Sequence, residues 1–124
     1  MKSQSDFRFL NWDVYKETKD FCRLIINLAK NLPKYIQYDL GSQLIRSSTS
    51  ILFNIAEGSG KSSDIDFRRF LNIAIGSAYE TLAHLDFLKD NGFLKLEEFE
   101  DLSQRLMSIC RQLGGFKKKL SKNL

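Results

Sequence analysis

The sequence is poor in residues that break or cross-link a chain. Among its 124 residues there is one proline, Pro33, and there are only two cysteines and one histidine. A chain with so few breaking residues forms a small number of long elements, which favours helices over many short strands. At this length, with 43% hydrophobic and 27% charged residues, the composition is typical of one globular domain spanning residues 1–124.

The scarcity of cysteine and histidine excludes several kinds of site. A disulfide scaffold would need more cysteines, and a structural metal site would need more thiolates or a histidine cluster. A di-metal site in a helical bundle needs Glu-x-x-His on two helices, whereas the single histidine, His84, follows Glu80 by four residues. We therefore predict no metal, no cofactor, and buried, reduced thiols at Cys22 and Cys110.

Long apolar runs are also absent. The longest, such as Leu24–Ile26, have three residues, whereas a membrane span needs about 18–20. The first six residues lack the apolar core and the small-residue cleavage site of a secretory signal. The sequence therefore predicts a soluble, cytoplasmic protein without a membrane partner.

The net charge of +4 is unevenly distributed along the chain. From residue 102 to the end there is no Asp or Glu, and the basic residues there are Arg105, Arg111, Lys117, Lys118, Lys119 and Lys122. A run of acidic residues precedes them, between residues 97 and 101. One explanation is the helix macrodipole, which favours acid at the start of a helix and base at its end. The other is a surface for nucleic acid, with these six residues as the candidate nucleic-acid-binding residues.

Apolar residues recur at steps of three and four in four stretches of the chain. The steps alternate without a break in the last stretch, through Phe99, Leu102, Leu106, Ile109, Leu113, Phe116 and Leu120. Together with the capping and breaking residues between the stretches, this pattern predicts helices over about residues 13–31, 37–59, 64–91 and 96–121. Short connections between helices of this length predict an all-α fold, an antiparallel up-down-up-down four-helix bundle.

Small residues interrupt the apolar stripes of the second and third helices. They form the groups Ser47–Ser50 and Gly76–Ala78, and we predict that a neighbouring helix approaches closely at both. In the fourth helix, Gly114 and Gly115 each lower helix stability by ~1 kcal/mol relative to alanine. That helix is therefore expected to fray beyond Gly115.

Reactive constellations are missing from the sequence. No set of residues supplies a nucleophile, a base and an oxyanion site together, so we predict that the protein is not an enzyme. Gly60-Lys61-Ser62 precedes a helix, as in a phosphate-binding loop, but Ile55 stands where that motif needs its first glycine. Glu57 lies in the last turn of the second helix, where negative charge is unfavourable, so we expect it to pair with Arg68 or Arg69 across the turn.

A specific pattern of residue types extends from residue 44 to residue 80. It comprises Leu44-Ile45-Arg46-Ser47-Ser48, then Asn54-Ile55-Ala56-Glu57-Gly58, and finally Gly76-Ser77-x-x-Glu80. With Trp12 and Phe93-Leu94 outside it, this pattern resembles the bacterial four-helix-bundle family found in intervening sequences of ribosomal RNA genes. The accessory protein of diversity-generating retroelements looks like a relative. The residues that carry the resemblance as a structural motif are Arg46, Asn54, Glu57, Gly58, Gly76, Ser77 and Glu80.

The resemblance covers nearly the whole chain and has consequences for function. It implies a homopentameric ring of four-helix protomers, an association with RNA, DNA or a nucleic-acid enzyme, and no enzymatic activity. Two hypotheses follow: an oligomeric binding protein with a basic surface for nucleic acid, or a protein–protein scaffold without nucleic-acid binding. The second is supported by apolar residues outside the main stripes: Tyr15, Ile26, Ile45, Phe53, Ile75, Tyr79 and Phe87.

Overall fold

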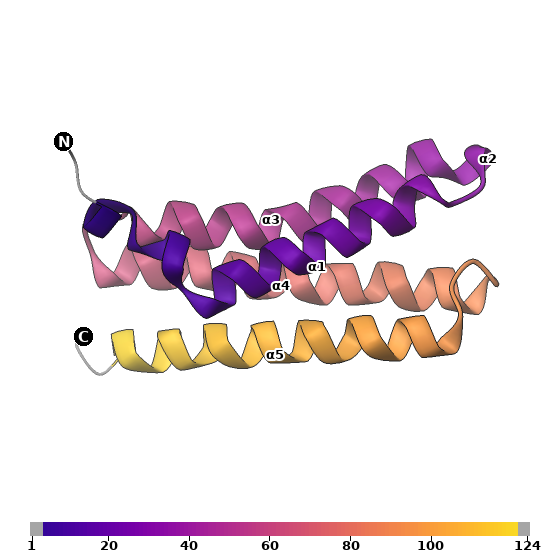
Figure 1. Cartoon of the computed structure of the whole chain (residues 1–124). Coiled ribbons are helices and arrows are strands. Elements are labelled where there is room, and N and C mark those ends of the chain that lie inside the picture. The colour runs from indigo at the N-terminus through magenta and orange to yellow at the C-terminus, as the bar shows by residue number, and fades with distance from the viewer. Residues whose placement is uncertain (1–3, 122–124) are drawn as a thin grey trace.

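The computed structural model describes residues 4–121, and within this range every regular element is helical. The segment η1 (Gln4–Asn11), two short 3-10 turns separated by a kink at Phe7, precedes α1 (Asp13–Lys30). The three-residue α2 (Lys34–Ile36), the π-helix η2 (Gln37–Gly41) and α3 (Ser42–Ser59) follow one another directly and act as one long helix. The helices α4 (Asp64–Asp90) and α5 (Leu96–Ser121) complete the described chain (Figure 1).

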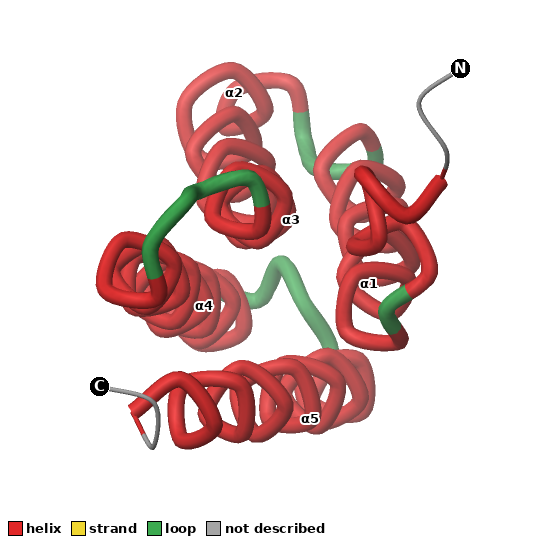
Figure 2. Tube along the Cα trace, turned by 90° about the vertical axis from the view of Figure 1, so that its left-hand side faces the viewer, coloured by secondary structure: helices red, strands yellow, loops and turns green. Residues whose placement is uncertain are grey.

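The four long helices within residues 4–121 run alternately in opposite directions, so both termini lie at the same end of the molecule (Figure 1). Seen along the bundle, α3 lies between α1 and α4, and α5 closes the square opposite α3 (Figure 2). The predicted all-α four-helix bundle is therefore confirmed. Each long helix contributes fully buried side chains to one core, including Phe21, Ile25, Leu44, Ile51, Ile55, Leu71, Leu85, Ile109 and Leu113.

Local capping chemistry accounts for most helix ends. The Ser63 hydroxyl accepts a hydrogen bond from the Asp66 backbone N–H at 3.1 Å and so caps the start of α4. Gly92, two residues after the last residue of α4, has a φ of +81°, the left-handed conformation that favours glycine. The observed bounds of α1, α4 and α5 differ from the predicted ones by at most one residue.

The predicted start of the second helix at residue 37 is wrong. Helical structure begins at Lys34, directly after Pro33, and passes through the π-helical turn of η2. The Gln37 side-chain amide donates to the carbonyls of Lys30 at 2.7 Å and Leu32 at 3.3 Å, and so caps the end of α1. These contacts depend on how η2 packs against the end of α1, and no local sequence pattern predicts them.

The prediction of close helix approach is right at one group of small residues and partly wrong at the other. Ser47 and Ser48 are buried, and Ala78 is buried on the facing helix. Gly76, however, is exposed, and a Cβ atom added there would meet nothing within 4 Å. The tight approach lies at Gly58, where an added Cβ would come within 2.8 Å of the Phe70 Cβ.

The expected fraying of α5 beyond Gly115 is also not observed. The helix continues through both glycines to Ser121. Phe116 and Leu120, which follow the glycines, are half-buried and pack against the core. Tertiary packing therefore outweighs the weak intrinsic helix propensity of this segment.

Candidate functional site

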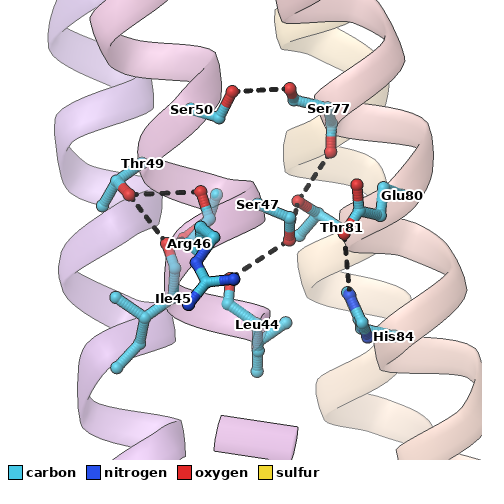
Figure 3. A network of polar contacts seen from close by, with 11 residues as sticks. Leu44, Ile45, Arg46, Ser47, Thr49, Ser50, Ser77, Glu80, Thr81 and His84 are labelled. Atoms are coloured by element: carbon cyan, nitrogen blue, oxygen red, sulfur yellow. Dashed lines mark hydrogen bonds and ion pairs between the residues drawn. The ribbon is translucent and has the colours of Figure 1, made fainter. Parts of the chain in front are cut away.

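Motif residues of α3 and α4 meet where these two helices pack together, along a line that we call the α3/α4 seam (Figure 3). The Thr81 hydroxyl donates to the Ser47 hydroxyl at 2.8 Å, and the hydroxyls of Ser50 and Ser77 are also 2.8 Å apart. The Asn54 amide donates to the Ser50 carbonyl at 2.7 Å. Among the described residues no buried side-chain N or O atom lacks a hydrogen-bond partner. The buried polar groups described in the seam are therefore all hydrogen-bonded within the protein, and none is left to bind a ligand.

Two motif residues lie on the outer side of the seam, in view in Figure 3. Glu80 lies 3.2 Å from the His84 ring across one helical turn. Arg46 is exposed, and within residues 4–121 no carboxylate lies within ion-pair distance of its guanidinium group. Arg46 is therefore a motif residue whose positive charge forms no ion pair with the described residues of its own chain.

Glu57 has a cationic partner, as a carboxylate in the last turn of a helix was expected to have. Lys61 is such a partner, because its Nζ is 3.9 Å from the Glu57 carboxylate. Arg69, one of the two predicted partners, pairs instead with Asp66 at 3.3 Å. Lys61 lies four residues after Glu57, just beyond the end of α3, and the sequence analysis did not consider it as a partner.

The predicted basic segment of α5 does not form one uniform face. Arg105 pairs with Asp101 at 3.0 Å, and it shares a helix face with Ser108 and Gln112, whose side chains donate to Glu17 of α1. Within residues 4–121 no carboxylate forms an ion pair with Arg111, Lys117 or Lys118. Lys119 is exposed, and Lys122 lies outside the described residues.

A second set of basic residues, which the sequence analysis did not single out, lies on α1. Lys16, Lys19, Arg23 and Lys30 are all exposed and face away from the core residues of α1; we call them the α1 basic row. Their steps of three, four and seven place them on one helix face over roughly 21 Å. None of the described carboxylates forms an ion pair with them, including Asp20 beside them on α1. The same three-and-four periodicity, applied to charges, would have revealed the row.

The thiols are poorly suited to nucleophilic chemistry. The buried Cys22 thiol donates to the Ser48 carbonyl at 3.3 Å, and burial raises its pKa to about 11. Burial also raises the pKa of the half-buried Cys110 thiol. Because the thiolate is the reactive form, both groups are weak nucleophiles near neutral pH. Both cysteines are free, as predicted, but only Cys22 is buried, so the prediction of a buried thiol at Cys110 is wrong.

Residues 4–121 contain no group of three or more His, Cys, Asp or Glu side chains that is placed to hold a metal ion. In the same range, no helix combines the length and the apolar character that crossing a membrane requires. What the described surface does offer is unpaired positive charge on α1, on part of α5 and at Arg46.

Comparison with known proteins agrees with the resemblance seen in the residue pattern. Residues 11–115 match the model of the 23S rRNA-intervening sequence protein family. The fold is similar to the crystal structure of a protein of unknown function from the S23 ribosomal protein family of Bacteroides thetaiotaomicron. That similarity has a TM-score of 0.76 and 29% sequence identity, and it covers 85% of this chain and 98% of the other. No curated protein matches the chain. The chain therefore belongs to the family of 23S rRNA-intervening sequence proteins.

Proposed function

We propose that this protein is a non-catalytic, oligomeric binding protein that holds nucleic acid by its phosphate backbone. The observation that carries the proposal is the α1 basic row, four exposed cations on one helix face without ion-pair partners among the described residues. When cations arranged in this way contact phosphates, they displace the counterions condensed on the nucleic acid. This release drives binding that does not depend on sequence. Arg111, Lys117 and Lys118 add positive charge on α5.

Self-association is the second part of the proposal. The outer side of α4 exposes Ile73 by 45%, Tyr79 by 70% and Phe87 by 55%, with Gly76 among them. A face of this kind on a helix is typical of an interface with another chain. In a ring of identical copies, such as the pentamer that the family resemblance implies, each α1 basic row would be repeated. Several weak phosphate contacts would then add up to useful affinity.

RNA is the first polyanion to test. The descriptions of the matching family and of the similar structure both refer to ribosomal components. Phosphate contacts alone do not distinguish RNA from DNA, so a mixed-sequence RNA and a duplex DNA belong in the same experiment.

Fluorescence anisotropy at ~50 mM and ~200 mM salt tests the nucleic-acid proposal. Four phosphate contacts predict a loss of affinity of about 50-fold for single-stranded RNA and about 150-fold for duplex DNA over this range. The variant K16Q/R23Q/K30Q is expected to bind at least about tenfold more weakly at ~50 mM salt. The matched control K61Q/R69Q/K89Q removes the same charge from three cations that already have ion-pair partners, and it should bind nearly as well as the parent.

Equal losses in both variants would show that only net charge matters, and the α1 basic row would then be no binding site. The variant R111Q/K117Q/K118Q measures the contribution of α5 in the same assay. No binding of either nucleic acid at ~50 mM salt would contradict the proposal, because phosphate contacts are strongest there.

A protein–protein scaffold without nucleic-acid binding is the second candidate, and the exposed side of α4 favours it. Sedimentation equilibrium at micromolar concentration should give a mass several times 14.4 kDa. The variant Y79S/F87S should shift this mass towards that of one chain, whereas I26S, an apolar-to-polar change on exposed α1 surface, should not. An oligomer that binds no nucleic acid would establish the scaffold, and a monomer would contradict self-association in both candidates.

A further inference from the structure

A small polar depression lies on the outer surface where η2 passes into α3. It has a volume of about 260 Å³ and is lined by Tyr38, Asp39, Ser42, Gln43 and Arg46. We call it the Tyr38 depression. It lies near the end of the bundle opposite the two termini, next to α2 (Figure 1). It is therefore separate from the basic end of α5.

The π-helical turn explains how a rigid helix presents this surface. On the inner side, the Gln37 side chain is hydrogen-bonded to the end of α1. Gly41 is buried beside α1, and a Cβ atom added there would lie 3.6 Å from the Ala29 Cβ. With these two residues held against α1, the intervening residues Tyr38 and Asp39 face outward. A π-turn inserted in an α-helix is rare and is frequently found at functional sites.

The aromatic rings beside the depression are unusually open. Tyr38 is 84% exposed and Tyr35 is 76% exposed, more than any other large apolar or aromatic side chain with a described environment. The Tyr35 ring makes an edge contact with Phe93 at 6.2 Å between ring centroids, which holds it beside α2. Two flat surfaces one helical turn apart are thus available to stack on flat ligands.

The polar groups of the depression are equally unused. Within residues 4–121 the side chains of Tyr38, Asp39, Ser42, Gln43 and Arg46 form no hydrogen bond or ion pair with the rest of the protein. Asp39 and Arg46 are seven residues apart, which separates their helix positions by roughly 10 Å. A ligand with an anionic end and a separate hydrogen-bond-donating end matches this arrangement.

We propose that the Tyr38 depression binds one nucleotide of a single-stranded nucleic acid, with the base stacked on Tyr38 and a phosphate on Arg46. This proposal rests on the proposed nucleic-acid function and adds a second, base-dependent contact to it. The ring of Tyr35 receives the neighbouring base, since single-strand-binding proteins combine aromatic stacking surfaces with nearby cations. Lys30 of the α1 basic row and Lys34 flank the short turn into α2, so positive charge continues along the chain to the two rings.

Asp39 gives the depression a preference among bases. An ionised carboxylate only accepts hydrogen bonds, and it repels phosphate. Guanine offers two neighbouring N–H donors on its Watson–Crick edge, whereas adenine and cytosine each offer one amino group there and uracil one N–H. The depression should therefore favour guanine, with the Gln43 amide free to donate to the base carbonyl.

The test uses the full-length protein and three labelled single-stranded RNAs of equal length, with alternating GU, AU and CU sequences. The parent should bind the GU strand most tightly. The variant Y38A should weaken single-strand binding by about tenfold, the effect expected for loss of one stacked base. R46Q should weaken all three strands alike, and D39N should remove the preference for GU. F53A, which removes an exposed aromatic ring from α3 outside the depression, is the matched control and should leave binding unchanged.

Duplex DNA separates this proposal from the broader one, because its bases are not available for stacking on Tyr38. Y38A should bind duplex DNA like the parent, whereas K16Q/R23Q/K30Q should not. If Y38A and F53A bind the single strands like the parent while the α1 variant fails, the depression is not a nucleotide site and the proposed function stands. If the parent binds neither single strands nor duplex at ~50 mM salt, both proposals are wrong.

Discussion

The two sides of α4 differ in how completely they are covered. The inner side buries Leu71, Ala78 and Leu85 in the core, whereas the outer side leaves large apolar side chains exposed. Its inner side meets α3 through the hydroxyls of Ser77 and Thr81, whereas its outer side exposes Tyr79 and Phe87. On the inner side every buried polar atom described has a partner, so the joint is complete within one chain. On the outer side, Tyr79 is 70% exposed and Phe87 is 55% exposed. If the protein self-associates as proposed, the outer side of α4 is the surface that we expect a second copy to cover.

The sharpest way to break the inner side is to add one methyl group at Gly58. A Cβ there would come within 2.8 Å of the Phe70 Cβ and 3.0 Å of the Phe67 ring. The Phe70 Cβ is fixed to its backbone and cannot rotate away, so α3 and α4 must separate. We expect G58A to lower the free energy of unfolding by ~1–3 kcal/mol, measured by urea denaturation.

Gly60 provides the control for this prediction. An added Cβ there would lie 3.6 Å from the Glu57 carbonyl oxygen, an ordinary contact, and its φ of −89° suits any residue. G60A should therefore unfold at nearly the same urea concentration as the parent. If G58A proved as stable as G60A, close approach would not hold the seam together.

A smaller effect is expected from removing one hydroxyl in the seam. T81V keeps the shape of the side chain but removes the hydroxyl, whose single proton is shared between the Ser47 hydroxyl and the Ser77 carbonyl, each 2.8 Å away. We expect a loss of ~0.5–1.5 kcal/mol in the free energy of unfolding. T49V is the control, because the half-buried Thr49 hydroxyl bonds only to carbonyls of its own helix. Equal losses in the two variants would show that the hydroxyl contact across the seam contributes nothing.

How much of this structure could be predicted depended on whether the cause was local. The bounds of α5 followed from an unbroken apolar period, and the cap of α4 depends only on Ser63 and the backbone of nearby Asp66. The π-helix could not be predicted, because Gln37 and Gly41 make their contacts with α1, far from any local signal. The family pattern located Arg46, but the Tyr38 depression beside it needs the three-dimensional turn.

The glycines show most clearly what cannot be predicted from the sequence. A small residue on a helix stripe predicts that something comes close, but the sequence does not say whether it is a helix of the same chain or of another. Gly58 and Gly76 both belong to the family pattern, and only Gly58 faces a helix within the protomer. The α1 basic row was missed for a different reason, since the search for charge followed runs along the chain and not faces of helices.

The smallest expected effect, and the one that sharpens the comparison most, comes from G76A. An added Cβ at Gly76 meets nothing within 4 Å, so alanine should raise the free energy of unfolding of the protomer by ~0.5–1 kcal/mol through helix propensity. If a second copy packs against the outer side of α4, the same methyl group should weaken self-association.

G115A is the control, because Gly115 is also exposed inside a helix with open space around it. Urea unfolding and sedimentation equilibrium, each at two protein concentrations, separate the two effects, because an oligomer's stability depends on concentration. A gain in stability for both variants, with weaker association for G76A alone, would identify Gly76 as a contact between copies. A loss of protomer stability in G76A would instead mean that this side of α4 is covered within the chain.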